Sequence, residues 1–287
     1  MLSRLQRIAL AGLAGILIFC VVIEASASGN HSSPENNKEP LTLGFFPIIS
    51  TVALFKRFAP LRDYLSNELG RPVVLETARD FPTFLKRTDQ RRYDIVVTAP
   101  HFAVRAADSG KYVVRATHVK DVEQLFIVRK DSEIKSVSDL AGKTIATPPR
   151  SALMTMMGKQ YLKEAGLTGD KQPKFLAFTT HNAANEAVIG GEVDAAIASS
   201  NIIKKALKQR KPVRILSKGL TLTNMATLVA TDLDGEIGEA VTETLVKMKN
   251  TETGKQVLKQ ISFPGFKRVT AKDYEPARPY MEQALGN

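Results

Sequence analysis

Residues 134–167 read IKSVSDLAGKTIATPPRSALMTMMGKQYLKEAGL. This stretch predicts a short strand at 144–146, a Pro-containing turn, and a helix over 151–165 that has no acidic residue in its first turn. The backbone N–H groups of a first helical turn are unpaired and carry the positive end of the helix dipole. The order strand, turn, helix therefore predicts an α/β fold with a helix start that can bind an anion.

The same alternation of strands and helices extends along most of the chain. It runs from residue 41 to about residue 116, with a predicted helix over 54–69 closed by Gly70 and a predicted strand over 73–76, and it begins again at residue 144. From residue 234 to the end the pattern predicts helices with breaks at Gly254 and Pro264. Apolar strands separated by helices indicate parallel βαβ units in sheets that are covered on both faces. Two extended runs, 124–129 and 225–230, bracket the second unit, so we expect two α/β lobes joined by two crossing strands, with a ligand cleft between them. The expected lobes are 41–126 plus 228–287 (lobe 1) and 127–227 (lobe 2).

The first 27 residues have the features of a secretory signal. Two arginines form a basic start, residues 8–23 form an apolar run, and Ala25-Ser26-Ala27 is an A-x-A cleavage site. An uncleaved anchor helix is one alternative, because the apolar run is slightly long for a signal. Acylation of Cys20 is a weaker alternative, because the bulky Phe19 precedes it. We expect cleavage after residue 27, export, and a disordered polar lead-in over 28–40.

Composition narrows the possible classes of function. Cys20 is the only cysteine, so the cleaved chain would have no disulfide, no thiolate metal site and no cysteine nucleophile. The formal net charge of +11 suits a nucleic acid, an anionic membrane or an anionic ligand. Export argues against nucleic acid, and the basic residues are scattered apart from a cluster at 204–211. A solvated basic face is the simpler explanation of this charge, so charge alone does not decide the partner.

Polar residues follow the predicted strands, at the edge where parallel α/β sheets bind ligands. Hydroxyl side chains in these places also cap helices, and a histidine there can be a simple surface residue. Arg150 is a stronger indication, because a guanidinium pairs bidentately with phosphate or carboxylate oxygens. The candidate ligand-binding residues are Ser50, Thr51, Thr98, His101, Arg150, Ser151, Ala152, His181, Asn182 and Ser199.

The sequence contains no recognisable set of catalytic residues. The G-x-S-x-G, H-E-x-x-H and P-loop motifs are absent. None of the four histidines has another at the spacing of a helical metal site. We therefore expect a protein that is not an enzyme and that needs no metal and no cofactor.

Four segments resemble the periplasmic phosphate/phosphite/phosphonate-binding proteins of ABC importers, which belong to the type II periplasmic binding protein superfamily. The resemblance implies a periplasmic, two-lobed monomer that captures a small anion, passes it to a membrane ABC permease and binds no nucleic acid. A ligand sensor for a membrane signalling protein and a binder of another small ligand, such as a sulfonate, are the alternatives. The segments are FAPLRDYLSNELGRPVVLE (58–76), YDIVVTAPHFAVRAADSG (93–110), SVSDLAGKTIATPPRSA (136–152) and HNAANEAVIGGEVDAAIASSN (181–201).

The chain departs from that family's pattern at positions expected to face the ligand. The family's anion loop carries a run of small hydroxylic residues, whereas residues 151–154 read Ser-Ala-Leu-Met, with one hydroxyl. The acidic residue that follows the family's histidine is Asn182 here, and an acidic residue expected near Asn224 is missing. An aminoalkylphosphonate is therefore expected to fit poorly, which leaves a smaller or more apolar oxyanion, or a different ligand.

Overall fold

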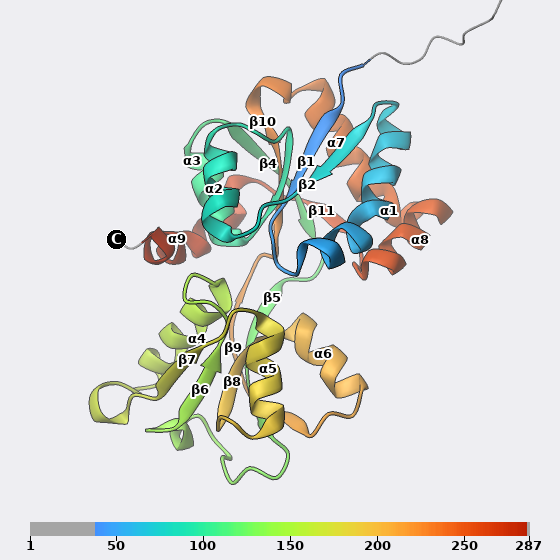
Figure 1. The fold of residues 1–287 in the computed structure, drawn as a ribbon. Coiled ribbons are helices and arrows are strands. Elements are labelled where there is room, and N and C mark those ends of the chain that lie inside the picture. The colour runs from blue at the N-terminus through green and yellow to red at the C-terminus, as the bar shows by residue number, and fades with distance from the viewer. Residues whose placement is uncertain (1–37, 286–287) are drawn as a thin grey trace, which may run out of the picture. The chain divides into compact units, whose positions relative to one another are not determined.

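The computed structural model describes residues 38–285, which form two α/β lobes, each built around one sheet (Figure 1). The predicted signal, the alternatives at residues 8–23 and Cys20, and most of the expected lead-in lie outside the described residues. No helix within 38–285 is both long and apolar enough to span a membrane.

Lobe 1 contains a six-stranded sheet with the order β11-β4-β10-β3-β1-β2. Strands β1, β2 and β3 are parallel, whereas β10 and β11 pair antiparallel with their neighbours. The η elements are 3₁₀ turns. The elements are β1 (Leu41–Phe45), α1 (Thr51–Leu69), β2 (Val73–Glu76), α2 (Phe81–Asp89), β3 (Ile95–Thr98), α3 (Pro100–Asp108), β4 (Tyr112–His118), β10 (Ala226–Ala230), η3 (Thr231–Leu233), α7 (Glu236–Lys247), η4 (Met248–Asn250), α8 (Glu252–Ile261), β11 (Phe266–Arg268), η5 (Ala271–Ala277) and α9 (Arg278–Leu285).

Lobe 2 contains a five-stranded sheet with the order β7-β6-β8-β5-β9. Strand β6 is parallel to β7 and β8, whereas β5 is antiparallel to β8 and β9. The elements are β5 (Val122–Arg129), η1 (Ser138–Leu140), β6 (Thr144–Thr147), α4 (Leu153–Glu164), η2 (Gly169–Lys171), β7 (Lys174–Ala177), α5 (His181–Gly190), β8 (Ala195–Ser199), α6 (Ser200–Lys208) and β9 (Val213–Leu222).

Each sheet is covered by helices on both faces, as the apolar strands predict. In lobe 1, α1, α7 and α8 pack on one face, and α2, α3 and η5 on the other. In lobe 2, successive residues of β5 alternate between the two faces. Phe126 joins the core under α4, and Leu125 and Ile127 join the core under α5 and α6. The two faces of each sheet therefore hold separate apolar cores.

Local signals fix several helix ends. Gly70 ends α1 in the left-handed conformation, with φ of 53°, which suits a residue without a Cβ. Asp80 caps α2 by accepting a hydrogen bond from the Thr83 amide at 2.8 Å. Thr180 caps α5 in the same way, from the Ala183 amide at 3.0 Å. Asp80 and Thr180 therefore fix the residues at which α2 and α5 begin.

The structure corrects three details of the sequence prediction. The sheets are mixed, not parallel throughout. Strand β11 lies in a region predicted to be helical. Helix α4 begins at Leu153 instead of Ser151, so Arg150 and Ser151 belong to the preceding turn.

The passages between the lobes are shorter than the predicted crossing strands. Strand β5 pairs only within the lobe 2 sheet, and β10 only within the lobe 1 sheet. The chain therefore changes lobe in two three-residue segments, 119–121 between β4 and β5 and 223–225 between β9 and β10.

Candidate functional site

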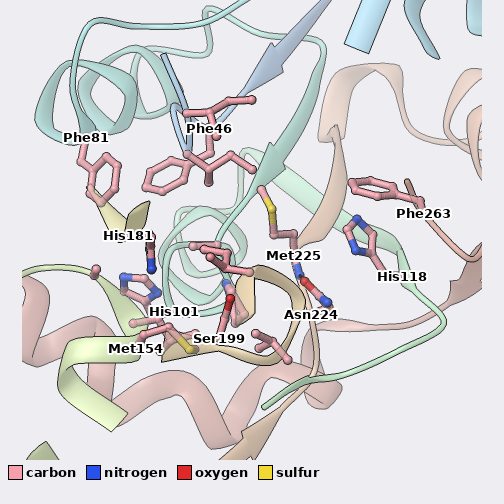
Figure 2. Close-up of a pocket in the computed structure, with 18 of the residues that line it drawn as sticks. Phe46, Phe81, His101, His118, Met154, His181, Ser199, Asn224, Met225 and Phe263 are labelled. Carbon is pink, nitrogen blue, oxygen red and sulfur yellow. Dashed lines mark hydrogen bonds between the residues drawn. The ribbon is translucent and has the colours of Figure 1, made fainter. Parts of the chain in front are cut away.

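Residues of both lobes line one cavity, with a volume of about 200 Å³. Lobe 1 contributes residues from the loop after β1, from α1 and from the start of α3, and lobe 2 contributes the starts of α4, α5 and α6. In Figure 2, His101, His181 and Met154 lie on one side of the cavity, and His118 and Phe263 lie on the other. The lining residues are Phe46, Ile48, Ile49, Arg57, Phe81, Ala99, Pro100, His101, His118, Val122, Ala152, Leu153, Met154, His181, Ser199, Ile202, Asn224, Met225 and Phe263.

His101 lies in the first turn of α3 and reaches the cavity from lobe 1. Pro100 precedes it, and a proline suits the first helical position because the N–H that it lacks has no intrahelical partner there. The His101 side chain is 1 % exposed. Neither ring nitrogen makes a well-formed hydrogen bond within 38–285. Burial lowers the pKa of His101 to about 3, and the nearby backbone of Ser151 opposes this effect. The imidazole is therefore neutral and adjoins the turn before α4.

His181 and Ser199 contribute polar groups from lobe 2. His181 is the first residue of α5, and Ser199 is the last residue of β8. The Nδ1 atom of His181 is buried without a partner among the residues described, and burial lowers the pKa of this histidine to about 4. Helices α3, α4 and α5 all begin without an acidic residue in the first turn. Their positive ends therefore meet the cavity without an internal counter-charge.

The other side of the cavity contains Arg57 and His118. The Nε and Nη2 atoms of Arg57 donate to the Ile261 carbonyl at 2.9 and 2.7 Å, which anchors the half-buried guanidinium in the wall. Burial, and to a smaller extent the positive charge of Arg57, lowers the pKa of His118 to about 3. This side thus combines a fixed cation with a neutral imidazole.

Asn224 lies in one of the two passages that connect the lobes, segment 223–225. Its Nδ2 donates to the Lys120 carbonyl at 3.0 Å, and its Oδ1 accepts from the Met225 amide at 2.7 Å. Its carbonyl accepts from the hydroxyl of Tyr274 at 2.9 Å. The side chain therefore joins segment 119–121 to segment 223–225 and lines the cavity at the same time.

The formal charge in the cavity lining is positive only. None of its nineteen lining residues is Asp or Glu, and Arg57 is the single lysine or arginine among them. No group of three His, Cys, Asp or Glu in the described part of the chain could hold a metal ion. A cationic ligand would find no counter-charge in this wall, whereas an anion would meet helix starts, imidazoles and a guanidinium.

The structure brings some of the predicted site residues to the cavity and leaves others away from it. His101, Ala152, His181 and Ser199 line it. Thr98 is buried close by, with an unpartnered hydroxyl among the residues described, but it does not line the cavity. Ser50, Thr51, Arg150 and Asn182 are exposed, and Ser151 is half-buried in the turn before α4.

Arg150 is the largest departure from the expected site. Its side chain lies outside the cavity lining, and its charge acts instead on Lys159 further along α4, where it adds to the effect of burial in lowering the pKa of that lysine. The helix start two residues later than predicted explains this position, because Arg150 and Ser151 then precede the first turn. Ala152, Leu153 and Met154 take the cavity-facing place.

Sequence reasoning missed Arg57, His118 and Phe263. Arg57 stands in the stripe of positions 54, 57, 58 and 61, whose other members are apolar and buried, and a charge in such a stripe is a detectable signal. His118 ends β4. It could have been found by the same expectation that ligand-binding residues lie at the ends of strands. Phe263 follows α8 and carries no polar signal.

Comparison with known proteins identifies the family. A family model described as "ABC transporter, phosphonate, periplasmic substrate-binding protein" matches residues 43–274. The chain belongs to this family. The family, as its description states, is one of periplasmic substrate-binding proteins of ABC transporters.

Solved structures agree with the fold of this phosphonate-family protein. The binding protein component of an ABC phosphonate transporter from Pseudomonas aeruginosa is 17 % identical, with a TM-score of 0.73 over 87 % of each chain. PhnD1 from Prochlorococcus marinus, in complex with methylphosphonate, is 19 % identical, with a TM-score of 0.74 over 86 % of this chain and 98 % of that one. A Xanthomonas citri protein bound to ATP is 17 % identical, with a TM-score of 0.72 over 86 % and 98 %. The type II periplasmic binding protein fold is thereby confirmed.

Proposed function

We propose that this chain binds a small oxyanion of the phosphate, phosphite or phosphonate class in the cavity between its lobes. The charged head would lie beside His101, His181 and Ser199, at the starts of α3, α4 and α5. Backbone N–H groups at these starts and the imidazole N–H groups would donate to the oxygens of the head. The cavity's lack of carboxylates supports this choice of ligand charge.

The observation that carries the proposal is the imidazole of His101, which is buried and makes no well-formed hydrogen bond to any residue that the structure describes. A buried polar group without a hydrogen bond costs about 1–3 kcal/mol. An anion that accepts a hydrogen bond from His101 removes this cost when it binds. The methylphosphonate held by PhnD1 of Prochlorococcus marinus supports the ligand class.

The family and the N-terminal sequence support a proposal for where the protein works and with which partner. In the proposed form, residues 1–27 are removed, and the chain works as a periplasmic monomer that delivers its ligand to a membrane permease. We place the boundaries between the lobes in segments 119–121 and 223–225, where the chain leaves one sheet and enters the other. Closure of the lobes about these segments would exclude water from the anion and strengthen its electrostatic interactions.

Calorimetry with phosphate, phosphite and methylphosphonate tests the ligand class directly. The variant His101→Gln should bind about tenfold to hundredfold more weakly than wild type, because hydrogen bonds to charged groups contribute about 1.5–3 kcal/mol each. Arg150→Gln is the matched control, since Arg150 is exposed outside the cavity. If no oxyanion of the three binds, the proposed function is wrong. If Arg150→Gln loses affinity and His101→Gln does not, the site assignment is wrong.

A further inference from the structure

The wall of the cavity is mostly hydrocarbon. Thirteen of its nineteen lining residues are apolar, and they come from both lobes. A site for inorganic phosphate alone would leave this surface in contact with water or empty, and neither arrangement gains the free energy of apolar burial. The composition of the wall therefore points to a ligand that has an apolar part as well as an anionic head.

Apolar side chains adjoin the proposed anion end of the cavity. Leu153 and Met154, the first two residues of α4, line the cavity next to the turn that approaches His101. In lobe 1, the rings of Phe46 and Phe81 lie 4.3 Å apart between centroids and line the same cavity. An anionic head at the helix starts would thus have aliphatic and aromatic groups directly beside it. A substituent on the head would contact them.

The charges of the lining oppose a cationic substituent. An ammonium group in this cavity would meet no carboxylate, and the one formal charge in the wall is the cation Arg57. A buried charge that lacks a partner is strongly disfavoured. The substituent that the cavity accepts must therefore be uncharged.

We infer that the preferred ligand of this cavity is an organic oxyanion, such as an alkyl- or arylphosphonate, whose substituent is uncharged, apolar and larger than a methyl group. This inference rests on the proposed function and extends it, because it names which member of the anion class the wall selects.

A ligand series measured by calorimetry tests the inference. Propylphosphonate should bind about tenfold more tightly than methylphosphonate, because it buries two further methylene groups. Phenylphosphonate should also bind more tightly than methylphosphonate. 2-Aminoethylphosphonate has nearly the same shape as propylphosphonate but replaces its terminal methyl by an ammonium group. It should bind at least about a hundredfold more weakly than propylphosphonate.

A variant pair then assigns the preference to the wall. Leu153→Asn keeps the branched shape but makes the wall polar, so it should reduce the ratio of propylphosphonate to methylphosphonate affinity several-fold. Leu176→Asn changes a half-exposed leucine of β7 outside the cavity and should leave that ratio unchanged.

The possible outcomes separate the inference from the function on which it rests. Methylphosphonate or phosphate binding as tightly as propylphosphonate would overturn the inference and leave the proposed function standing. Equal affinities for propyl- and 2-aminoethylphosphonate would also overturn the inference. If no phosphonate or phosphate binds, the proposed function fails and the inference fails with it.

Discussion

The imidazole of His118 packs against the phenyl ring of Phe263, with 3.7 Å between the ring centroids. The guanidinium of Arg57 lies 5.7 Å from the centroid of the same phenyl ring. A protonated His118 would place a second positive charge close to Arg57 in a buried wall, so the protein keeps this imidazole neutral. Together with His101 and His181, it makes three histidines around one cavity; His101 and His118 are buried, and His181 is half-buried with its Nδ1 atom enclosed.

These three histidines should make the stability of the ligand-free protein depend on pH. Their pKa values are about 3, 3 and 4 in the folded protein, compared with about 6.5 in an unfolded chain. Between these values the unfolded chain takes up protons that the folded chain does not, so the free energy of unfolding falls as the pH drops from about 6.5 toward 4. Above about pH 6.5 the three histidines should not change the free energy of unfolding. At pH 5 each histidine should lower the free energy of unfolding by about 2 kcal/mol.

Urea unfolding at pH 7.5 and pH 5.0 measures this loss, and pH 5.0 lies above the range in which most carboxylates titrate. His118→Gln supplies the control. The variant should lose about 2 kcal/mol less than wild type between the two pH values, whatever its stability at pH 7.5. An identical loss in variant and wild type would show that His118 is not neutral and buried.

Ligand binding should take up protons at mildly acidic pH. An anion within hydrogen-bonding reach favours a charged imidazole and raises its pKa by about 1–3 units. For His181, whose pKa is about 4 without ligand, this change produces partial protonation near pH 5.5. Calorimetric titrations with methylphosphonate in buffers of different ionisation enthalpy report the proton uptake. His181→Gln should take up fewer protons than wild type. Equal uptake would assign the protons to the phosphonate itself.

Gly219 should resist replacement because the side chain of Gln124 occupies the space beside it. A Cβ built on Gly219 would lie 1.8 Å from Gln124 Oε1, and Gln124 is fully buried between β8 and β9. Gly219→Ala should therefore lower the free energy of unfolding by about 1–3 kcal/mol through overpacking.

The double variant Gly219→Ala, Gln124→Ala tests whether that overpacking is the cause. Gln124→Ala removes the amide that blocks the Cβ, so the second substitution should recover stability relative to Gly219→Ala alone. Denaturant unfolding of wild type, both single variants and the double variant completes the cycle. If the double variant loses as much free energy of unfolding as the two single variants together, a direct clash between residue 219 and Gln124 is contradicted.

The periodic parts of the fold were the predictable parts. Strand β2 was placed at its observed ends, and α1 was correctly closed at Gly70, because alternation and a left-handed glycine are local signals. Strand direction depends on pairing between distant segments, so the antiparallel positions of β5 and β10 gave no local sign. The three-residue strand β11 is too short to carry a pattern, and it forms because it can pair with β4.

The sequence could predict only those site residues that end a strand or follow one. His101, His181 and Ser199 follow or end strands, and all three line the cavity. Arg150 also follows a strand, but a shift of two residues in the start of α4 takes its side chain out of the lining. Arg57 enters from the side of a helix, so its role depends on how α1 packs against Phe263, which the sequence does not state.

A contact of the C-terminal helix links the lobes in addition to the two passages. Tyr280 of α9 is buried in the core under α4 in lobe 2. The adjacent Arg278 pairs with Asp108 of α3 in lobe 1, at 2.6 Å. If the lobes move apart about segments 119–121 and 223–225, α9 cannot keep both of these contacts. The burial of Tyr280 therefore stabilises the observed arrangement of the lobes, by about 1.5–3 kcal/mol for one large side chain.

We expect Tyr280→Ala to favour the open form and to weaken methylphosphonate binding by about tenfold or more, because closure then gains less free energy. Small-angle scattering should show a larger radius of gyration for the ligand-free variant than for ligand-free wild type, and calorimetry should show the loss of affinity. Tyr64→Ala is the control, since Tyr64 is a buried tyrosine of the lobe 1 core. It should lower the melting temperature without changing the radius of gyration. If Tyr280→Ala behaves like this control, the C-terminal helix stabilises the fold and does not hold the lobes together.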